Sequence, residues 1–193
     1  MPRAGYLTAS TFPDLMTRGK GGQEFGKTAM RHIEQLALDM LRVDRAEDIT
    51  ADSLEWGLEH EDNARYFYQE ATLYKVGQAE FRISKELSFV GGEMDGLVGD
   101  DGGIEIKCPK SSTKHMFHFA EHYEEYAYQV QGYLWIYRLK WIDFVSYDPR
   151  CPKPHQLQIR RIEPDAGIIK ALQERCKAAH SEAIKLVEEV QAC

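Results

Sequence analysis

The chain has 193 residues, a formal net charge of −7 and a hydrophobic fraction of 43%. This length suffices for one domain with a substantial core, and we expect a single domain over residues 1–193. No apolar run approaches the ~20 residues that a membrane-spanning helix needs, so we expect no membrane partner. The first residues lack the apolar core of a signal peptide, and the four cysteines form no C-x-x-C pair, which together favour a reducing, cytoplasmic setting.

The first part of the chain is predicted to be mainly helical after an irregular arm and a basic, glycine-rich loop that ends at Gly22. An uninterrupted apolar stripe predicts a helix over 23–41. A second helix is predicted to start at Thr50 or Asp52 and to end near Thr72. Among its acidic residues, Glu61 is favoured as the one that points inward, because a glycine one turn earlier lets another group approach closely.

The stretch 91–110 is predicted to be a hairpin that brings two carboxylates together. Its middle is rich in Gly and Asp, which tolerate the positive φ angles of a tight turn. Side chains alternate along a strand, so Glu105 and Lys107 share one face of the return strand, and Asp95 on the adjoining strand can reach that face. Two carboxylates beside a lysine favour a hard divalent cation, although an ordinary solvated strand gives the same alternation.

An Asp followed about ten residues later by Glu-x-Lys resembles the PD-(D/E)xK nuclease core. With the strands predicted over 73–78 and 86–90, the hairpin would belong to a mainly antiparallel sheet. The resemblance implies an α/β (α+β) fold with a central mixed sheet flanked by helices. The acidic net charge counts against nucleic-acid binding, yet net charge is a sum, and a metal-dependent nuclease concentrates acids at its centre.

Residues 111–138 are predicted to be largely helical, with a serine-rich cap at their start. Within them His115, His118 and His122 are spaced to share one helix face, which makes them a rival zinc site. Catalytic zinc clusters normally recruit a ligand from another segment and show an HExxH-like pair. Gln129 is an amide in an otherwise aromatic segment, and a metal-bound water is one partner that a buried amide can find.

The last third of the chain is predicted to hold two strands and a long helix. Residues 141–147 alternate in the manner of a strand, and residues 155–162 alternate again. Pro164-Asp165 opens a C-terminal helix that ends near Val190, with one apolar side and no residues that suggest chemistry.

The motifs in chain order resemble the phage lambda exonuclease family, also called the YqaJ viral recombinase family, over nearly the whole chain. Two matching pieces lie in the first third of the chain: Leu7-Thr8-Ala9-Ser10 resembles the family's ITAS element, and Leu54-Glu55-Trp56-Gly57 with Glu61, Ala64 and Arg65 resembles LAWGxxxExxAR. In the middle, Asp95-Gly96-Leu97 with Glu105-Ile106-Lys107-Cys108-Pro109 resembles PDGL…ExKCP. Further on, Gln129-Val130-Gln131, Trp135 and Tyr147-Asp148-Pro149-Arg150 resemble QVQ…W…YDPR.

This resemblance implies a Mg²⁺-dependent exonuclease that resects linear duplex DNA 5′ to 3′, prefers a 5′-phosphate and leaves 3′ single strands for recombination. Asp95 and Glu105, with the carbonyl of Ile106, would hold the catalytic Mg²⁺, for which Mn²⁺ could substitute. Glu61 would help to position a second ion, and two such ions ~4 Å apart can stabilise the attacking and leaving oxygens of a phosphodiester.

The same resemblance implies roles for residues around the metals. Lys107 would orient or deprotonate the attacking water, and Gln129 would steady Lys107 or that water. Arg3 and Ser10 match positions that grip the 5′-phosphate of the resected strand. Leu54 matches an apolar wedge that separates the terminal base pairs.

Family members form ring-shaped homotrimers that thread DNA, and they work with a single-strand annealing protein, so we expect both for this chain in the cytoplasm of a bacterial host. A ring also allows an acidic exterior beside a basic channel. Two alternatives keep the fold: a structure-specific or sequence-specific endonuclease, and a DNA-binding subunit without activity. The intact Asp95, Glu105 and Lys107 set argues against the second alternative.

Overall fold

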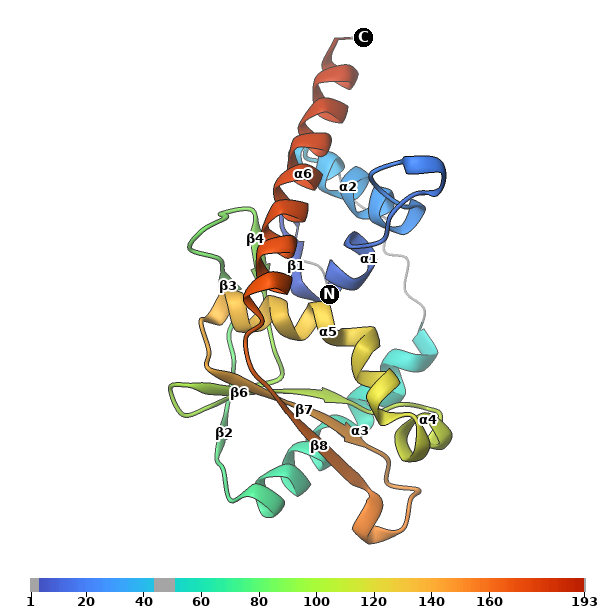
Figure 1. Ribbon diagram of the computed structural model, residues 1–193, viewed down its shortest axis with the longest axis vertical. Coiled ribbons are helices and arrows are strands. Elements are labelled where there is room, and N and C mark those ends of the chain that lie inside the picture. Colours follow the sequence, from blue (N-terminus) through green and yellow to red (C-terminus); the bar gives the residue numbers. More distant parts are fainter. Residues whose placement is uncertain (1–3, 44–50, 193) are drawn as a thin grey trace.

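The computed structural model describes residues 4–43 and 51–192, while the side chains of residues 51–55 and 58 stay outside the description. In this part of the chain, two β-sheets are separated by one long helix, and further helices cover their outer faces (Figure 1). The larger sheet has five strands in the order β2 (Val76–Gly77), β5 (Gly96–Val98), β6 (Gly102–Lys107), β7 (Trp141–Tyr147) and β8 (Leu157–Ile162).

The larger sheet is mixed, because β6 and β7 run parallel while its other neighbouring strands run antiparallel. The smaller sheet has three strands in the order β1 (Leu7–Thr8), β4 (Val90–Gly92) and β3 (Arg82–Ile83), with β1 parallel and β3 antiparallel to β4. A mixed sheet flanked by helices, as the sequence predicts, is confirmed.

Helical segments lead into the sheets and connect them. The short ones are η1 (Ala9–Thr11), α1 (Phe12–Leu15), η2 (Lys20–Gly22), α4 (Ser112–Phe117) and η3 (Lys153–His155). The long ones are α2 (Lys27–Met40), α3 (Ala51–Thr72), α5 (Phe119–Tyr137) and α6 (Ala166–Gln191). The predicted helices up to Thr72 and from Asp165 onward are confirmed, and the helix predicted over 23–41 is present but begins only at Lys27. The Asp165 side chain caps α6 by accepting from the N–H of Gly167 at 2.8 Å.

Helix α5 lies between the two sheets and is buried on nearly every side over its second half. On one side its aromatic residues pack around Phe144 of β7, with ring centroids at 5.4 Å for Tyr123 and 5.9 Å for Tyr126. On the other side it contacts β4 and α1. Because α5 is enclosed in this way, polar side chains on it must find partners inside the protein.

Helix α3 covers the opposite face of the larger sheet. Ala64 and Tyr68 of α3 are fully buried against a cluster that includes Ile104 and Ile106 of β6. The predicted alternation of β6 is therefore confirmed: its isoleucines face α3, while Glu105 faces the Gln129 side chain of α5.

Several predicted elements differ in the structure. The strand predicted over 86–90 corresponds to β4, which lies in the smaller sheet and not beside the hairpin. The helix predicted over 111–138 is broken at His118, whose φ of −128° and ψ of 36° separate α4 from α5. The first strand of the predicted hairpin begins only at Gly96, because the segment before it turns from β4 into the larger sheet. Asp95 thus lies in a connection between the two sheets and not within a strand.

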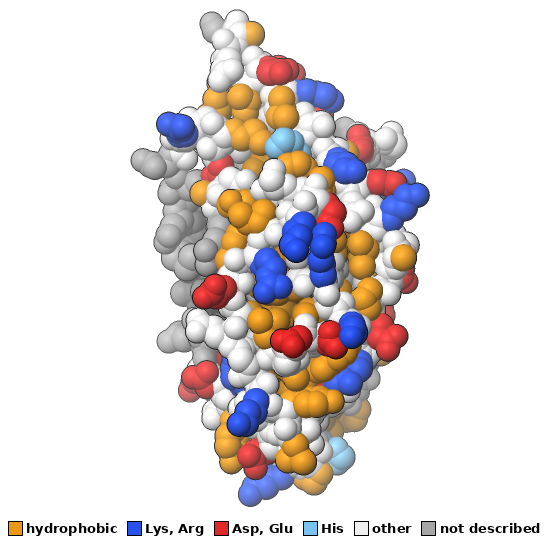
Figure 2. Space-filling view, turned by 90° about the vertical axis from the view of Figure 1, so that its left-hand side faces the viewer, with side chains coloured by type: hydrophobic (Ala, Val, Ile, Leu, Met, Phe, Trp, Pro, Cys, Tyr) orange, Lys and Arg blue, Asp and Glu red, His pale blue; other side chains and the backbone are white. Residues whose placement is uncertain are grey.

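The surface of the described chain is uneven in charge. Figure 2 shows a face on which Lys and Arg side chains gather near the middle, with acidic side chains below them and apolar side chains between. The net charge of −7 therefore does not spread evenly over the molecule. Among the described helices, none has the length and apolar character needed to cross a membrane.

Candidate active site

The centre of the site is Glu105, which lies on β6 with only 2% of its surface exposed. Its Oε1 accepts two hydrogen bonds, from Lys107 Nζ at 2.8 Å and from Gln129 Nε2 at 2.7 Å. Its Oε2 is buried and has no hydrogen-bond partner among the described residues. A buried carboxylate oxygen without a partner is costly, which suits an oxygen that binds a cation.

Asp95 lies beside Glu105 because a backbone group of β6 holds it. Its Oδ2 accepts a hydrogen bond from the N–H of Ile106 at 2.6 Å. Burial and the negative charge of Glu105 raise the pKa of Asp95 to about 7. Burial likewise raises the pKa of Glu105, although the Lys107 ammonium opposes that rise. The two carboxylates therefore resist ionising together, and a cation between them would relieve this.

Helix α3 brings a third carboxylate to the site through an arginine. Arg65 donates from Nη1 to the backbone carbonyl of Asp95 at 2.5 Å and from Nη2 to Glu61 Oε1 at 2.9 Å. Burial, followed by the negative charge of Asp95, raises the pKa of Glu61. A Cβ atom at position 96 would lie 2.3 Å from Val76 Cγ1 and 2.9 Å from Arg65 Nη1, so Gly96 leaves room for both side chains.

Lys107 is held as a cation. Its Nζ contacts Glu105 and lies 4.5 Å from the centroid of the Tyr126 ring. Burial opposes the charged form, but the carboxylates of Glu105 and Asp95 outweigh it and raise the pKa of Lys107 above its ordinary value. The side chain is therefore an ammonium at neutral pH in the metal-free protein. In that form it can orient a water or a phosphate oxygen but cannot accept a proton.

The residues present fit a hard divalent cation. The unpartnered oxygen of Glu105 and the raised pKa of Asp95 both indicate a pair of carboxylates whose negative charge Lys107 alone does not balance. No group of three His, Cys, Asp or Glu side chains in the described ranges is close enough to form a complete cluster. Further oxygen ligands for such an ion would come from backbone carbonyls, water or substrate, as is usual for Mg²⁺.

Gln129 joins the site through Glu105 and not through Lys107. Its amide nitrogen also lies 3.1 Å from the Tyr133 hydroxyl, one turn further along α5. The sequence motifs pointed neither to Tyr133 nor to the role of Arg65. The spacing of Glu61 and Arg65, four residues apart on one helix, is the signal that could have indicated Arg65 as a partner.

The DNA-end residues predicted from the family resemblance stay predictions. Arg3 and the side chain of Leu54 lie outside the described residues. Ser10 is exposed in η1, and its Oγ lies 3.1 Å from Thr8 Oγ1.

The three histidines of the rival zinc site do not come together. His115 is buried, with Nδ1 2.9 Å from Ser146 Oγ and Nε2 2.8 Å from the carbonyl of His155. His118 is exposed at the helix break, and His122 is buried near Phe144, where burial lowers its pKa to about 4. A shared face for the three histidines required one continuous helix, and the break at His118 means that they no longer lie on one face.

Comparison with known proteins gives the chain a family. Residues 2–139 match the model of the YqaJ-like viral recombinase domain. The chain belongs to this family. The resemblance seen in the sequence motifs is therefore confirmed.

Solved structures extend the YqaJ likeness to nearly the whole chain. An alkaline exonuclease from Laribacter hongkongensis is 29% identical, with a TM-score of 0.85 over 98% of this chain and 93% of that one. The same exonuclease in complex with dAMP gives a TM-score of 0.86. A phage-related exonuclease from Haemophilus somnus 129PT shares the fold at 20% identity, with a TM-score of 0.76 over 96% of each chain. No curated protein sequence matches the chain.

Proposed function

We propose that this YqaJ-family protein is a Mg²⁺-dependent exonuclease that resects linear duplex DNA from 5′ ends and leaves 3′ single strands for recombination. The observation that carries the proposal is the buried Glu105–Asp95 pair, with one carboxylate oxygen unpartnered among the described residues and Lys107 alongside. The similarity to an alkaline exonuclease over 98% of the chain supports it. The site belongs to the PD-(D/E)xK type, on a single domain over residues 1–193.

Asp95, Glu105 and the carbonyl of Ile106 would hold the first Mg²⁺, for which Mn²⁺ can substitute, and Glu61 would help to hold a second. When bound, such ions polarise a phosphoryl oxygen and lower the pKa of a coordinated water. Arg65 supports this arrangement because it holds both the Asp95 backbone and the Glu61 carboxylate.

Lys107 and Gln129 both orient the Glu105 carboxylate, and Lys107 has a further role. Both donate to Oε1 of Glu105, which leaves Oε2 as the oxygen that faces a cation. Because Lys107 is an ammonium, its role is to orient the attacking water or to stabilise charge on the phosphate. It does not act as the base while it remains protonated.

At the DNA end, Arg3 and Ser10 would grip the 5′-phosphate and Leu54 would separate the terminal base pairs. We further propose a homotrimeric ring, a single-strand annealing protein as partner and a cytoplasmic location in a bacterial host. The uneven charge of the surface supports a DNA-binding role despite the acidic total (Figure 2).

The deciding experiment uses linear duplex DNA with a phosphate on one 5′ end and a hydroxyl on the other, incubated with Mg²⁺ and sampled over time on a denaturing gel. We expect the phosphorylated strand to shorten from its 5′ end first. Equal loss of both strands would remove the phosphate grip and keep the nuclease. A covalently closed circle is the control, because it is cut only if the alternative, an endonuclease, is correct. No loss with Mg²⁺ or Mn²⁺ would overturn the proposal.

A further inference from the structure

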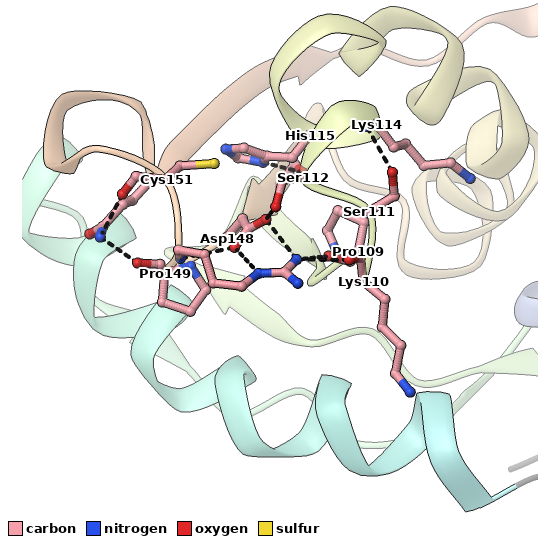
Figure 3. Close-up of polar contacts among 12 residues, drawn as sticks. Pro109, Lys110, Ser111, Ser112, Lys114, His115, Asp148, Pro149 and Cys151 are labelled. Atoms are coloured by element: carbon pink, nitrogen blue, oxygen red, sulfur yellow. Dashed lines mark hydrogen bonds and ion pairs between the residues drawn. The ribbon is translucent and has the colours of Figure 1, made fainter.

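The segment that follows Lys107 at the end of β6 is held by a residue that lies outside the β5–β6 hairpin. Beyond Lys107 the chain leaves the sheet through Cys108, Pro109 and Lys110. The carbonyls of Pro109 and Lys110 accept hydrogen bonds from one atom, Nη2 of Arg150, at 3.3 Å and 2.8 Å (Figure 3). Arg150 follows the end of β7, the parallel neighbour of β6. One arginine therefore fixes the direction in which the chain leaves β6.

Asp148 holds this arginine in place. Its carboxylate accepts from Arg150 Nε and Nη2, both at 2.8 Å, in the two-point geometry that suits a guanidinium. The same carboxylate has no exposed surface and also accepts from Ser112 Oγ at 2.7 Å, at the start of α4. Although burial opposes it, these hydrogen bonds lower the pKa of Asp148 to about 2, so the pair stays ionised near neutral pH.

The arginine also reaches α3. The guanidinium carbon of Arg150 lies 4.7 Å from the centroid of the Trp56 ring. Trp56 precedes Glu61 by less than two turns on the same helix. Asp148 and Arg150, which we call the clamp, thus contact the segment that follows Lys107, the start of α4 and the helix that carries Glu61.

We infer that Arg150, held by Asp148, is a positioning residue that fixes the end of β6 relative to α3 and so sets the spacing of the Glu105–Lys107 pair and Glu61. The inference rests on the proposed function for its catalytic consequence. It does not require Arg150 to touch DNA or metal, because its partners among the described residues are a carboxylate, two backbone carbonyls and an indole ring.

The geometry of the guanidinium distinguishes this role from a simple charge effect. A lysine in place of Arg150 keeps the positive charge but cannot form the two-point contact with Asp148 and reach two carbonyls as well. If Arg150 instead bound a DNA phosphate through its charge, lysine would preserve much of the activity. The pair of variants Arg150→Lys and Arg150→Ala therefore separates positioning from phosphate binding.

The chain offers a matched control. Arg161 makes the same two-point contact with a buried aspartate, Asp143, at 2.9 Å and 2.9 Å. Its side chain is 43% exposed, against 44% for Arg150. Asp143 lies opposite Ile104, whereas Lys107 lies opposite Ser146 toward the other end of β7. Arg161→Lys should lower thermal stability as Arg150→Lys does, but it should not cause the same loss of activity and of Mn²⁺ affinity.

The experiment measures kcat and KM on linear duplex DNA, and separately the affinity for Mn²⁺ from the electron paramagnetic resonance signal of the free ion. For Arg150→Lys and Arg150→Ala alike we expect kcat to fall and the Kd for Mn²⁺ to rise, each by about 10-fold or more, with KM little changed. Arg161→Lys should leave both within about twofold, because Arg161 bonds neither the segment after Lys107 nor the start of α4, and the hydrogen bond from the Tyr68 hydroxyl of α3 to Asp143 at 2.8 Å stays in this variant.

Three results would overturn the inference: Lys rescuing the Ala variant, an unchanged Mn²⁺ affinity in both Arg150 variants, or an equal loss in Arg161→Lys. The Mn²⁺ titration also separates this inference from the proposed function. If the wild-type protein binds Mn²⁺ but leaves DNA intact, the proposed function alone fails and the clamp is judged on Mn²⁺ affinity. If the wild type binds no Mn²⁺, both fail.

Discussion

The amide of Gln129 donates to Oε1 of Glu105 at 2.7 Å, while Oε2 of the same carboxylate is buried without a partner among the described residues. The two residues lie on opposite sides of a packed layer, one on α5 and one on β6. Gln129 therefore fixes the orientation of the carboxylate and decides which of its two oxygens faces the site. This relationship suggests that catalysis depends on an amide that need not touch the substrate.

Gln129→Met should remove this orientation while preserving the approximate volume of the side chain. We expect activity to fall by about 10- to 100-fold, as for other residues that orient a metal ligand. Stability should fall by about 1–3 kcal/mol, because a buried acceptor loses a hydrogen bond. Nuclease assays and urea denaturation measure the two effects.

Gln131→Met is the control for that substitution. Gln131 lies on the same helix and is equally buried, but its amide bonds the carbonyl of Glu163 at 3.0 Å and the N–H of Asp165 at 2.8 Å. It should cost comparable stability and leave kcat near the wild-type value. Equal losses of activity in the two variants would mean that Gln129 acts only through stability.

Lys107→Ala should reduce cleavage by at least about 100-fold, because it removes the only described cation that contacts Glu105. DNA binding and the circular dichroism spectrum should change little, since Lys107 is partly exposed at the end of its strand. Lys140→Ala removes a surface ion pair with Asp101 and serves as the control. Normal turnover by Lys107→Ala would contradict its proposed role.

The raised pKa of Asp95 predicts how the metal-free protein responds to pH. Between its ordinary value of 3.8 and about 7, Asp95 keeps its proton in the folded state and loses it in the unfolded state. The folded state thus binds more protons, so this group's contribution to stability is greatest below pH 3.8 and declines as the pH rises to about 7. Thermal melts in EDTA across that range should show a shallower decline for Asp95→Asn.

Metal binding should show the matching dependence. A cation binds the ionised carboxylates, so its affinity should increase as the pH rises through about 7, and binding should release protons. Calorimetric titration of Mn²⁺ in buffers of different ionisation enthalpy would measure the protons released. An affinity that does not change with pH would show that Asp95 is not a ligand.

Arg65→Gln should weaken the link between α3 and the Asp95 segment, since one guanidinium bonds both the Asp95 carbonyl and Glu61. We expect about a tenfold loss of activity or more, through misplaced carboxylates. Gly96→Ala should disturb the same contact, because its Cβ would crowd Arg65 Nη1 at 2.9 Å, and it should also lower stability, because that Cβ would lie 2.3 Å from Val76 Cγ1. In a double-mutant cycle the losses of activity should be less than additive, because both variants disturb the Arg65 contact, whereas the loss of stability from the Val76 clash should add to that of Arg65→Gln.

Local pattern was enough to predict much of the fold. The helix ending at Thr72, the strand over 141–147 and the Asp165 cap follow from periodicity and capping, which depend on neighbours in sequence. The alternation that places Glu105 and Lys107 together is likewise a property of any strand. The family motifs added the expected chemistry of the site, and the match over residues 2–139 bears out the family.

The sequence by itself thus determined the mixed sheet with its flanking helices, the family and the residues from which a site could be built. Only the tertiary structure decided their partners. The helix break at His118 separates three histidines that the spacing had aligned. Contacts between residues far apart in the chain set the rest: Gln129 with Glu105, Arg65 with Asp95, and Arg150 with the loop after β6. Such contacts depend on how α3 and α5 pack against opposite faces of one sheet, and no local pattern encodes that packing.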